Sequence, residues 1–287
     1  MQGFHLLLSL TATVMGLSGL NQSGPDNTPA KFSPSEKVMT HRLGERVISV
    51  KLIQYGDIVN TCCINVHDNE RTAVEAAKAV LQKEGGILIK IENNAQRFIS
   101  FPFKDQVYTF DPNRIFSRAG ILLTLKTKGR INPGAISEVE KFADQLLKLI
   151  PDSINCVIAL HNNYDGDFSV KTYLPGGKRQ KDAKLVYADE WQDIDDIALT
   201  TDHSLYDKMA SFGYNSILQD NDNVFRDGSL SVYYGELNKR YVNIETQHGK
   251  NNLYQEMLAK LLSVLDNERR PAEGLAVIAP ASDEADR

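Results

Sequence analysis

The segment His67-Asp-Asn-Glu70 places an imidazole and a carboxylate three residues apart, directly after the apolar run Cys62–Val66. Both groups bind zinc, so a His-x-x-Glu pair at the end of a strand can supply two ligands to one ion. A third ligand is available at His161, which follows the apolar run Ile154–Leu160. Catalytic zinc sites commonly have three protein ligands and an open fourth position. The sequence therefore predicts a zinc site formed by these three side chains.

A hydrolytic zinc site also needs a group that moves protons. A zinc ion acidifies water and polarises a carbonyl group, and a separate carboxylate accepts and returns the proton. Glu245 is the candidate for this carboxylate, because it stands at the end of the apolar stretch Tyr241–Ile244. Glu245 is thus predicted to act as general base and general acid.

Basic residues at three places in the chain are candidates for contacts with a substrate. Arginine binds a carboxylate through two parallel hydrogen bonds, so Asn113 and Arg114 are expected to hold a substrate carboxylate. Arg97 is then available to stabilise negative charge on the carbonyl oxygen. The basic loop Lys178–Lys181 either attracts an anionic substrate or is an ordinary exposed loop.

These residues can meet only if several strands end at the same edge of one sheet. Strands and helices alternate along the chain, which predicts a sheet covered by helices on both faces and a ligand site beyond the carboxyl ends of its strands. Leu230–Tyr234 is predicted as a further strand, and Ser137 with Glu140 as a helix-capping box. The main predicted strands are Arg46–Ile53, Val59–Val66, Gly86–Ile91, Ile154–Leu160 and Tyr241–Ile244, and the main predicted helices are Arg71–Leu81, Ala135–Ile150, His203–Phe212 and Leu253–Leu265.

The composition is that of an ordinary soluble globular protein. The chain has 287 residues, of which 42% are hydrophobic and 24% charged. Its net charge of -5 argues against a nucleic-acid partner, which would favour a basic face. Three cysteines do not form a disulfide framework, so Cys62, Cys63 and Cys156 are predicted to be small buried residues in neighbouring central strands.

The two ends of the chain differ from its centre. Phe4–Leu20 is mostly apolar and is similar to a secretory signal, although no Lys or Arg precedes it. We therefore predict a signal segment at residues 1–24, a linker at 25–42, a zinc hydrolase domain at 43–268 and a disordered tail at 269–287. The predicted location is secreted or periplasmic, with a cytoplasmic protein as the alternative. No other apolar run is long enough to span a membrane, so none is expected in the mature protein.

The order of these motifs resembles the zinc metallocarboxypeptidase superfamily, which includes the carboxypeptidases and the succinylglutamate desuccinylase and aspartoacylase deacylases. The resemblance covers roughly residues 46–265. It implies a three-layer α/β/α sandwich around a mixed, mostly parallel eight-stranded sheet. It also implies Zn²⁺ bound by His67, Glu70 and His161, Glu245 as general base, Arg97 polarising the scissile carbonyl, and Asn113 and Arg114 holding a carboxylate. The matching segments are His67-Asp-Asn-Glu70, Asp111-Pro-Asn-Arg114-Ile-Phe, His161-Asn-Asn and Asn243-Ile-Glu245.

Some positions depart from the pattern of this superfamily. Asp68 stands where the family often has glycine, and is the first place to look for an unusual specificity. Ile115 and Phe116 are closer to the deacylases than to the peptidases. The tyrosine that covers the substrate in the peptidases is not identified by the motifs, and the candidates are Tyr206, Tyr214, Tyr233 and Tyr234.

Three functions follow from these features. The first is a zinc-dependent, carboxypeptidase-like hydrolase that cleaves an amide bond adjacent to a carboxylate in a small peptide, such as a cell-wall peptide. The second is an N-acyl amino acid deacylase. The third is a catalytically inactive binding protein on the same fold, against which the full set of ligands and Glu245 argue. A plainer interpretation of the same residues is that His67 and His161 are buried core histidines and that Asp111-Pro-Asn is only a turn.

Overall fold

The structure is a computed structural model that describes residues 30–57, 61–166 and 168–268. The predicted signal segment and tail lie outside the described residues, as do residues 25–29 of the predicted linker. The linker prediction is wrong for residues 34–42, because Pro34–Leu43 form strand β1, which pairs antiparallel with β2 (Arg46–Tyr55). Most of β1 is exposed at the edge of the sheet, so its sequence carries no apolar alternation.

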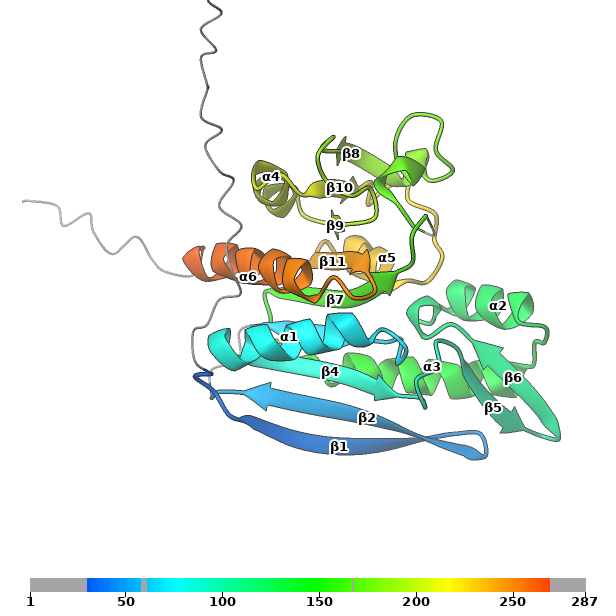
Figure 1. The fold of residues 1–287 in the computed structure, drawn as a ribbon. Coiled ribbons are helices and arrows are strands. Elements are labelled where there is room, and N and C mark those ends of the chain that lie inside the picture. Colours follow the sequence, from blue (N-terminus) through cyan, green and yellow to red (C-terminus); the bar gives the residue numbers. More distant parts are fainter. Residues whose placement is uncertain (1–29, 58–60, 167, 269–287) are drawn as a thin grey trace, which may run out of the picture.

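In the described part of the chain, nine strands form one mixed sheet in the order β1-β2-β4-β3-β7-β11-β9-β10-β8 (Figure 1). The predicted mixed sheet is confirmed, with one strand more than expected. The central strands β4, β3, β7 and β11 are parallel to one another, whereas the pairings of β1–β2, β2–β4, β11–β9 and β10–β8 are antiparallel. The remaining strands are β3 (Cys62–Asn65), β4 (Gly86–Glu92), β7 (Cys156–Asn163), β8 (Ala183–Tyr187), β9 (Ile197–Thr200), β10 (Asn215–Gln219), β11 (Arg240–Gln247) and the separate hairpin β5 (Ile99–Phe103) and β6 (Gln106–Phe110).

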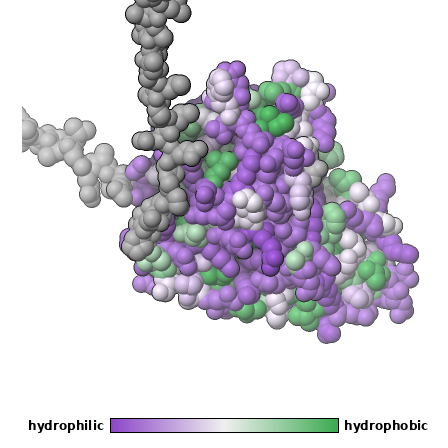
Figure 2. All heavy atoms as spheres, viewed as in Figure 1, coloured by the Kyte–Doolittle hydropathy of each residue, from purple (hydrophilic) through white to green (hydrophobic). Residues whose placement is uncertain are grey.

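Helices cover both faces of this sheet, which confirms the three-layer sandwich (Figure 1). Two hydrophobic cores lie between the layers. Apolar stripes on the helices face these cores, and the outer surface over α1 and α6 is largely hydrophilic (Figure 2). One face carries α1 (Arg71–Glu84), α4 (His203–Ser211) and α6 (Asn251–Asn267), and the other carries α2 (Arg118–Thr127), α3 (Pro133–Leu147) and α5 (Leu230–Glu236).

None of the helices in the described residues is both long enough and apolar enough to cross a membrane.

Two local predictions are wrong. Leu230–Tyr234 begins helix α5 instead of forming a strand, because Leu230 and Tyr234, four residues apart, both face the core. Helix α3 starts at Pro133, and the side chain of Asn132 caps it by accepting hydrogen bonds from the backbone of the first turn. Ser137 and Glu140, which were predicted to form a capping box, therefore lie inside the helix and do not mark its start.

The central strands place the predicted site at one edge of the sheet. In the parallel pairing of β7 with β11, His161 lies opposite Glu245. On the side away from β11, β7 pairs with β3, and His67 lies two residues after the end of β3. The three cysteines are free and buried in β3 and β7, as predicted. The sheet therefore gathers side chains that are far apart in the sequence.

Helix α2 contacts the turn that carries Asp227 through two glycines. A methyl group at Gly120 would lie 2.5 Å from Cα of Gly228 and 2.6 Å from the carbonyl oxygen of Arg114. Alanine normally stabilises a helix by about 0.5–1 kcal/mol relative to glycine. Here we expect Gly120→Ala to lower the free energy of unfolding by about 1–3 kcal/mol, because backbone atoms must move.

Chemical denaturation measures this change. The control is Lys126→Ala on the exposed side of the same helix, which should stay within about 0.5 kcal/mol of the parent. A Gly120→Ala protein as stable as the parent would contradict the close contact between α2 and the turn.

Candidate metal centre

His67, Glu70 and His161 meet at the carboxyl edge of the central strands. Nδ1 of His67 lies 2.9 Å from Oε1 of Glu70, and Nδ1 of His161 lies 2.9 Å from Oε2. The two Nδ1 atoms are 3.2 Å apart. All three side chains are buried, and one ligand atom from each lies within 4.8 Å of the others. Two imidazole nitrogens and a carboxylate facing one point are a donor set that fits a divalent metal ion such as zinc.

The orientation of His67 is fixed by Asp111. Oδ1 of Asp111 lies 2.7 Å from Nε2 of His67, and it also accepts a hydrogen bond from the backbone N–H of Asn113. A carboxylate on the outer nitrogen of a ligating histidine holds the ring in place and leaves the other nitrogen free for a metal. The sequence motif contained Asp111, but only the structure shows this contact.

The charges around Glu70 favour its ionised form. Burial alone would raise the pKa of Glu70, but the neighbouring His67 and His161 outweigh burial and hold the pKa well below its usual range. Nη1 of Arg97 also donates a hydrogen bond of 2.7 Å to Oε1. Glu70 is therefore a carboxylate that is ready to serve as a ligand.

Glu245 has the opposite electrostatic character. Burial raises the pKa of Glu245, and although His161 opposes this shift, the charge of Glu70 adds to it. Nδ2 of Asn243 donates a hydrogen bond of 3.2 Å to Oε2 of Glu245. A carboxylate with a raised pKa is suited to taking up and releasing a proton near neutral pH.

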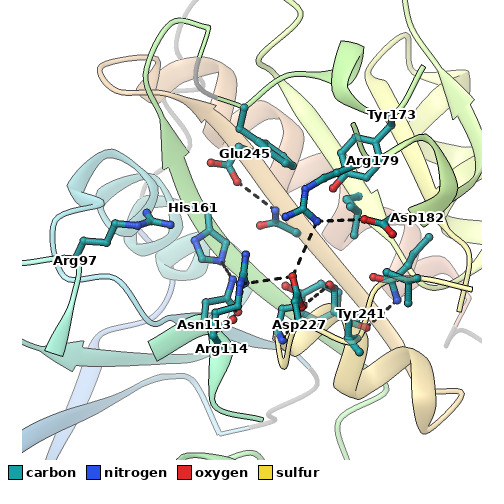
Figure 3. A pocket seen from close by; sticks show the side chains of 18 residues that line it. Arg97, Asn113, Arg114, His161, Tyr173, Arg179, Asp182, Asp227, Tyr241 and Glu245 are labelled. Carbon is teal, nitrogen blue, oxygen red and sulfur yellow. Dashed lines mark hydrogen bonds and ion pairs between the residues drawn. The ribbon is translucent and has the colours of Figure 1, made fainter. Parts of the chain in front are cut away.

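A cavity of about 160 Å³ opens beside these groups (Figure 3). Five of the seven residues predicted from the sequence line it, and the other two, His67 and Glu70, lie directly behind His161. The structure thus brings all seven predicted residues to one place. The five in the cavity wall are Arg97, Asn113, Arg114, His161 and Glu245.

The far wall of the cavity was not predicted. None of the four tyrosines considered from the sequence lines the cavity, whereas Tyr173 and Tyr241 do. Burial raises the pKa of Tyr173 to about 12. Arg179 was visible as part of a basic loop, but nothing in the sequence placed it beside Asp182 and Asp227 in the wall.

Asp68 is not in the cavity wall, so the specificity role considered for it does not fit its position. Its Oδ2 accepts hydrogen bonds from the backbone N–H groups of Asn93 (2.6 Å) and Ala95 (2.8 Å), and its Oδ1 pairs with Lys90. Ala95 has a positive φ of 55°, which is a strained conformation for a non-glycine residue. Asp68 therefore holds the loop that leads to Arg97.

No family model and no curated protein matches the sequence. Similar solved structures include an aspartoacylase family protein from Mesorhizobium loti, with 14% identity, coverage of 84% of this chain and 68% of that chain, and a TM-score of 0.42. A second is the murein-tripeptide amidase from Escherichia coli O157, with 10% identity, coverage of 75% of this chain and 86% of that chain, and a TM-score of 0.39. A third is thrombin activatable fibrinolysis inhibitor, with 12% identity, coverage of 80% of this chain and 72% of that chain, and a TM-score of 0.44. At these identities and TM-scores, the similarity gives no information about the reaction, which has to be inferred from the side chains.

The role of Asp68 can be tested by its removal. Asp68→Ala leaves the buried backbone N–H of Asn93 without its acceptor and releases the strained loop, so we expect a loss of about 1–3 kcal/mol in the free energy of unfolding. Glu92→Ala is the control. It removes the other carboxylate that pairs with Lys90, which is half-buried and lies 3.0 Å from Nζ of Lys90. It should cost at most about 1 kcal/mol. Equal losses in urea denaturation would show that Asp68 acts only through Lys90.

Proposed function

We propose that this protein is a zinc-dependent hydrolase that cleaves the amide bond next to a free carboxylate, in the manner of a carboxypeptidase acting on small peptides. The observation that carries this proposal is that one cavity is lined by His161 of the metal-ligand set, by the separate buried carboxylate of Glu245 and by the guanidinium groups of Arg97 and Arg114. His67, Glu70 and His161 would hold the zinc ion. When bound, zinc polarises a carbonyl group and acidifies water.

Glu245 has the position and the environment of a general base. It comes from β11, directly opposite His161 in the neighbouring strand, and it lines the cavity. It receives a proton from the attacking water and passes it to the leaving amine. Asn243 donates to Oε2, and no other described residue forms a hydrogen bond with Oε1, so this second oxygen of the carboxylate is available for the exchange.

The position of Arg114 and Asn113 in the cavity wall supports their proposed role in binding the carboxylate of the substrate. Nη1 of Arg114 is fixed by a hydrogen bond of 2.6 Å to the carbonyl oxygen of Asn113, and Nε lies 3.5 Å from Oδ2 of Asp227. The remaining amino group, Nη2, has no hydrogen bond to the part of the chain that the structure describes, so it can donate to a ligand. Arg97, which donates one hydrogen bond to Glu70, has further N–H groups for the carbonyl oxygen, where negative charge develops in the transition state.

The cavity wall has guanidinium groups for a substrate carboxylate, and carboxypeptidases and N-acyl amino acid deacylases both act beside such a group. The deacylase-like feature of the sequence, Ile115-Phe116, does not favour the second activity. Both side chains are buried in the hydrophobic core and are not part of the cavity wall. A peptide substrate is therefore our first choice, and export through the N-terminal segment would bring the protein to cell-wall peptides.

The roles of the metal ligands and of Glu245 can be separated. The purified protein should contain about one zinc ion per chain, as three protein ligands imply. Glu245→Gln should retain this zinc and lower kcat by about 10²–10⁴-fold, because the general base is lost. Metal analysis and peptide hydrolysis measure the two effects.

His161→Ala should lose both the metal and the activity, whereas the exposed His203→Ala should retain both. Hydrolysis by Glu245→Gln at the parent rate would place the base elsewhere. Protein prepared without chelators that contains no zinc would rule out the proposed zinc hydrolase.

The proposed role of Arg114 predicts a selective effect. Arg114→Ala should lower kcat/KM for peptides with a free terminal carboxylate by about 10–100-fold, which corresponds to the loss of a charge-assisted hydrogen bond. C-terminally amidated peptides lack the group that Arg114 binds, so their slow hydrolysis should change little. Arg118→Ala is the control, since Arg118 is exposed and pairs with Glu140. Equal losses on both kinds of peptide would contradict the carboxylate-binding role.

A further inference from the structure

A buried hydroxyl group close to the candidate metal centre has no part in the proposed reaction. It belongs to Tyr254 of α6, which is 0% exposed and packs in the hydrophobic core that α6 shares with α1. The hydroxyl group accepts a hydrogen bond of 3.2 Å from the backbone N–H of His161 in β7. It donates a hydrogen bond of 3.0 Å to the carbonyl oxygen of Ile244 in β11. A side chain from a helix thus joins two central strands of the sheet.

The two backbone groups lie at the step of the sheet that carries a candidate metal ligand and the candidate base. His161 is opposite Glu245 in the parallel pairing of β7 with β11, and Ile244 directly precedes Glu245. In a parallel sheet, the backbone groups of neighbouring strands ordinarily pair with each other. Here a hydroxyl group bonds to one backbone group on each strand, so the separation of the strands at this step depends on a residue outside the sheet.

Tyr254 lies on the opposite face of the sheet from the cavity. Leu160 and Ile244 belong to the same hydrophobic core as Tyr254. Side chains alternate between the two faces along a strand. The next residue in each strand, His161 or Glu245, therefore points to the other face and lines the cavity (Figure 3). Tyr254 is not part of the cavity wall, so any influence on the site has to pass through the backbone of β7 and β11.

Polar side chains also hold the backbone on either side of this step. Nδ2 of Asn65 in β3 donates a hydrogen bond of 3.1 Å to the carbonyl oxygen of Leu160. Nδ2 of Asn162 in β7 donates one of 3.3 Å to the carbonyl oxygen of Thr246 in β11. The asparagines come from the strands themselves, whereas Tyr254 comes from α6. The carboxyl edge of the sheet is therefore held by specific side-chain contacts, and α6 supplies the contact at the backbone of the candidate ligand.

We propose that Tyr254 is a positioning residue for the metal centre. Its hydroxyl group sets the separation of His161 from Glu245. It thereby also sets the geometry in which the His161 ring meets the other two candidate ligands of a divalent metal ion. This inference rests on the zinc site of the proposed function and deepens it.

Tyr254→Phe is the test, because it keeps the buried ring and removes only the hydroxyl group. The N–H of His161 and the carbonyl group of Ile244 then lose a buried partner, so the strands have to shift or leave these groups unpaired. We expect zinc to bind about 10-fold more weakly, which is the lower end of the effect of losing a group behind a metal ligand. Competition with a chelator measures this affinity without a substrate. The visible absorption spectrum of the Co²⁺-loaded protein should also change, because it reports the geometry of the ligands.

Tyr214→Phe is the matched control. Tyr214 is buried in the same core, and its hydroxyl group donates a hydrogen bond of 2.8 Å to Oε1 of Glu256 in α6. It lies outside the cavity wall and makes no hydrogen bond to β7 or β11 among the described residues. Both variants should unfold at a lower urea concentration than the parent, but Tyr214→Phe should bind zinc as the parent does. The metal titrations are made in buffer in which both variants are folded.

Peptide hydrolysis at saturating zinc separates positioning from substrate binding. Tyr254→Phe should lower kcat by about 10-fold and leave KM nearly unchanged, because Asn113 and Arg114 belong to a different segment of the chain. Equal zinc affinities, Co²⁺ spectra and kcat values for Tyr254→Phe and Tyr214→Phe would overturn the inference. Tyr254 would then be an ordinary buried contact between α6 and the sheet.

The metal titrations also separate this inference from the proposed reaction. If the parent binds zinc but hydrolyses no peptide, the hydrolase is contradicted, and weaker zinc binding by Tyr254→Phe alone would still support the inference. Hydrolysis by the parent, with unchanged zinc binding and kcat in Tyr254→Phe, would retain the hydrolase and overturn the inference. A parent protein that binds no divalent metal ion would overturn both.

Discussion

The site depends on the burial of one carboxylate, that of Glu70, between two imidazole rings. A buried ionised carboxylate is very costly unless it is paired and hydrogen-bonded. Glu70 is 1% exposed and contacts His67, His161 and Arg97. These partners come from the end of β3, from β7 and from the loop after β4, so the fold must hold three distant segments to within about a hydrogen-bond length of one another.

Helix α1 shows how the chain keeps Glu70 available. Glu70 occupies the N-cap position of this helix, but its side chain makes no capping hydrogen bond. The capping function is supplied from another strand, because Oδ1 of Asn162 in β7 accepts a hydrogen bond of 2.9 Å from the backbone N–H of Ala73. Asn162 directly follows His161 in β7. The strand that carries this candidate ligand therefore also accepts a hydrogen bond from the first turn of α1, the helix that follows His67 and Glu70. Glu70 therefore stands at the start of a helix without using its carboxylate as the cap.

The sequence predicted those parts of the site that depend on local patterns. His67, His161 and Glu245 follow or end apolar runs, and parallel strands necessarily bring such positions to one edge. The far wall has no such signal. Arg179 and Asp182 lie in a loop, and Asp227 in a turn, and their meeting depends on how these segments fold over the sheet. Strand β1 escaped prediction for a related reason, because an exposed edge strand is stabilised by its backbone pairing and not by an apolar face.

The short helical turn Pro112–Arg114 joins the two halves of the cavity. Asp111 before it fixes His67 through Nε2, Nδ2 of Asn113 lies 3.4 Å from Nε2 of His161, and Arg114 faces Asp227. The segment is thus the turn that Asp, Pro and Asn favour, and it also links the candidate metal ligands to the proposed substrate-binding groups. Because the backbone of Asn113 donates to Asp111 and accepts from Arg114, a displacement at either end is passed to the other. The candidate metal centre and Arg114 are therefore expected to keep a fixed distance, which the proposed hydrolase would need in order to place one particular amide bond beside Glu245.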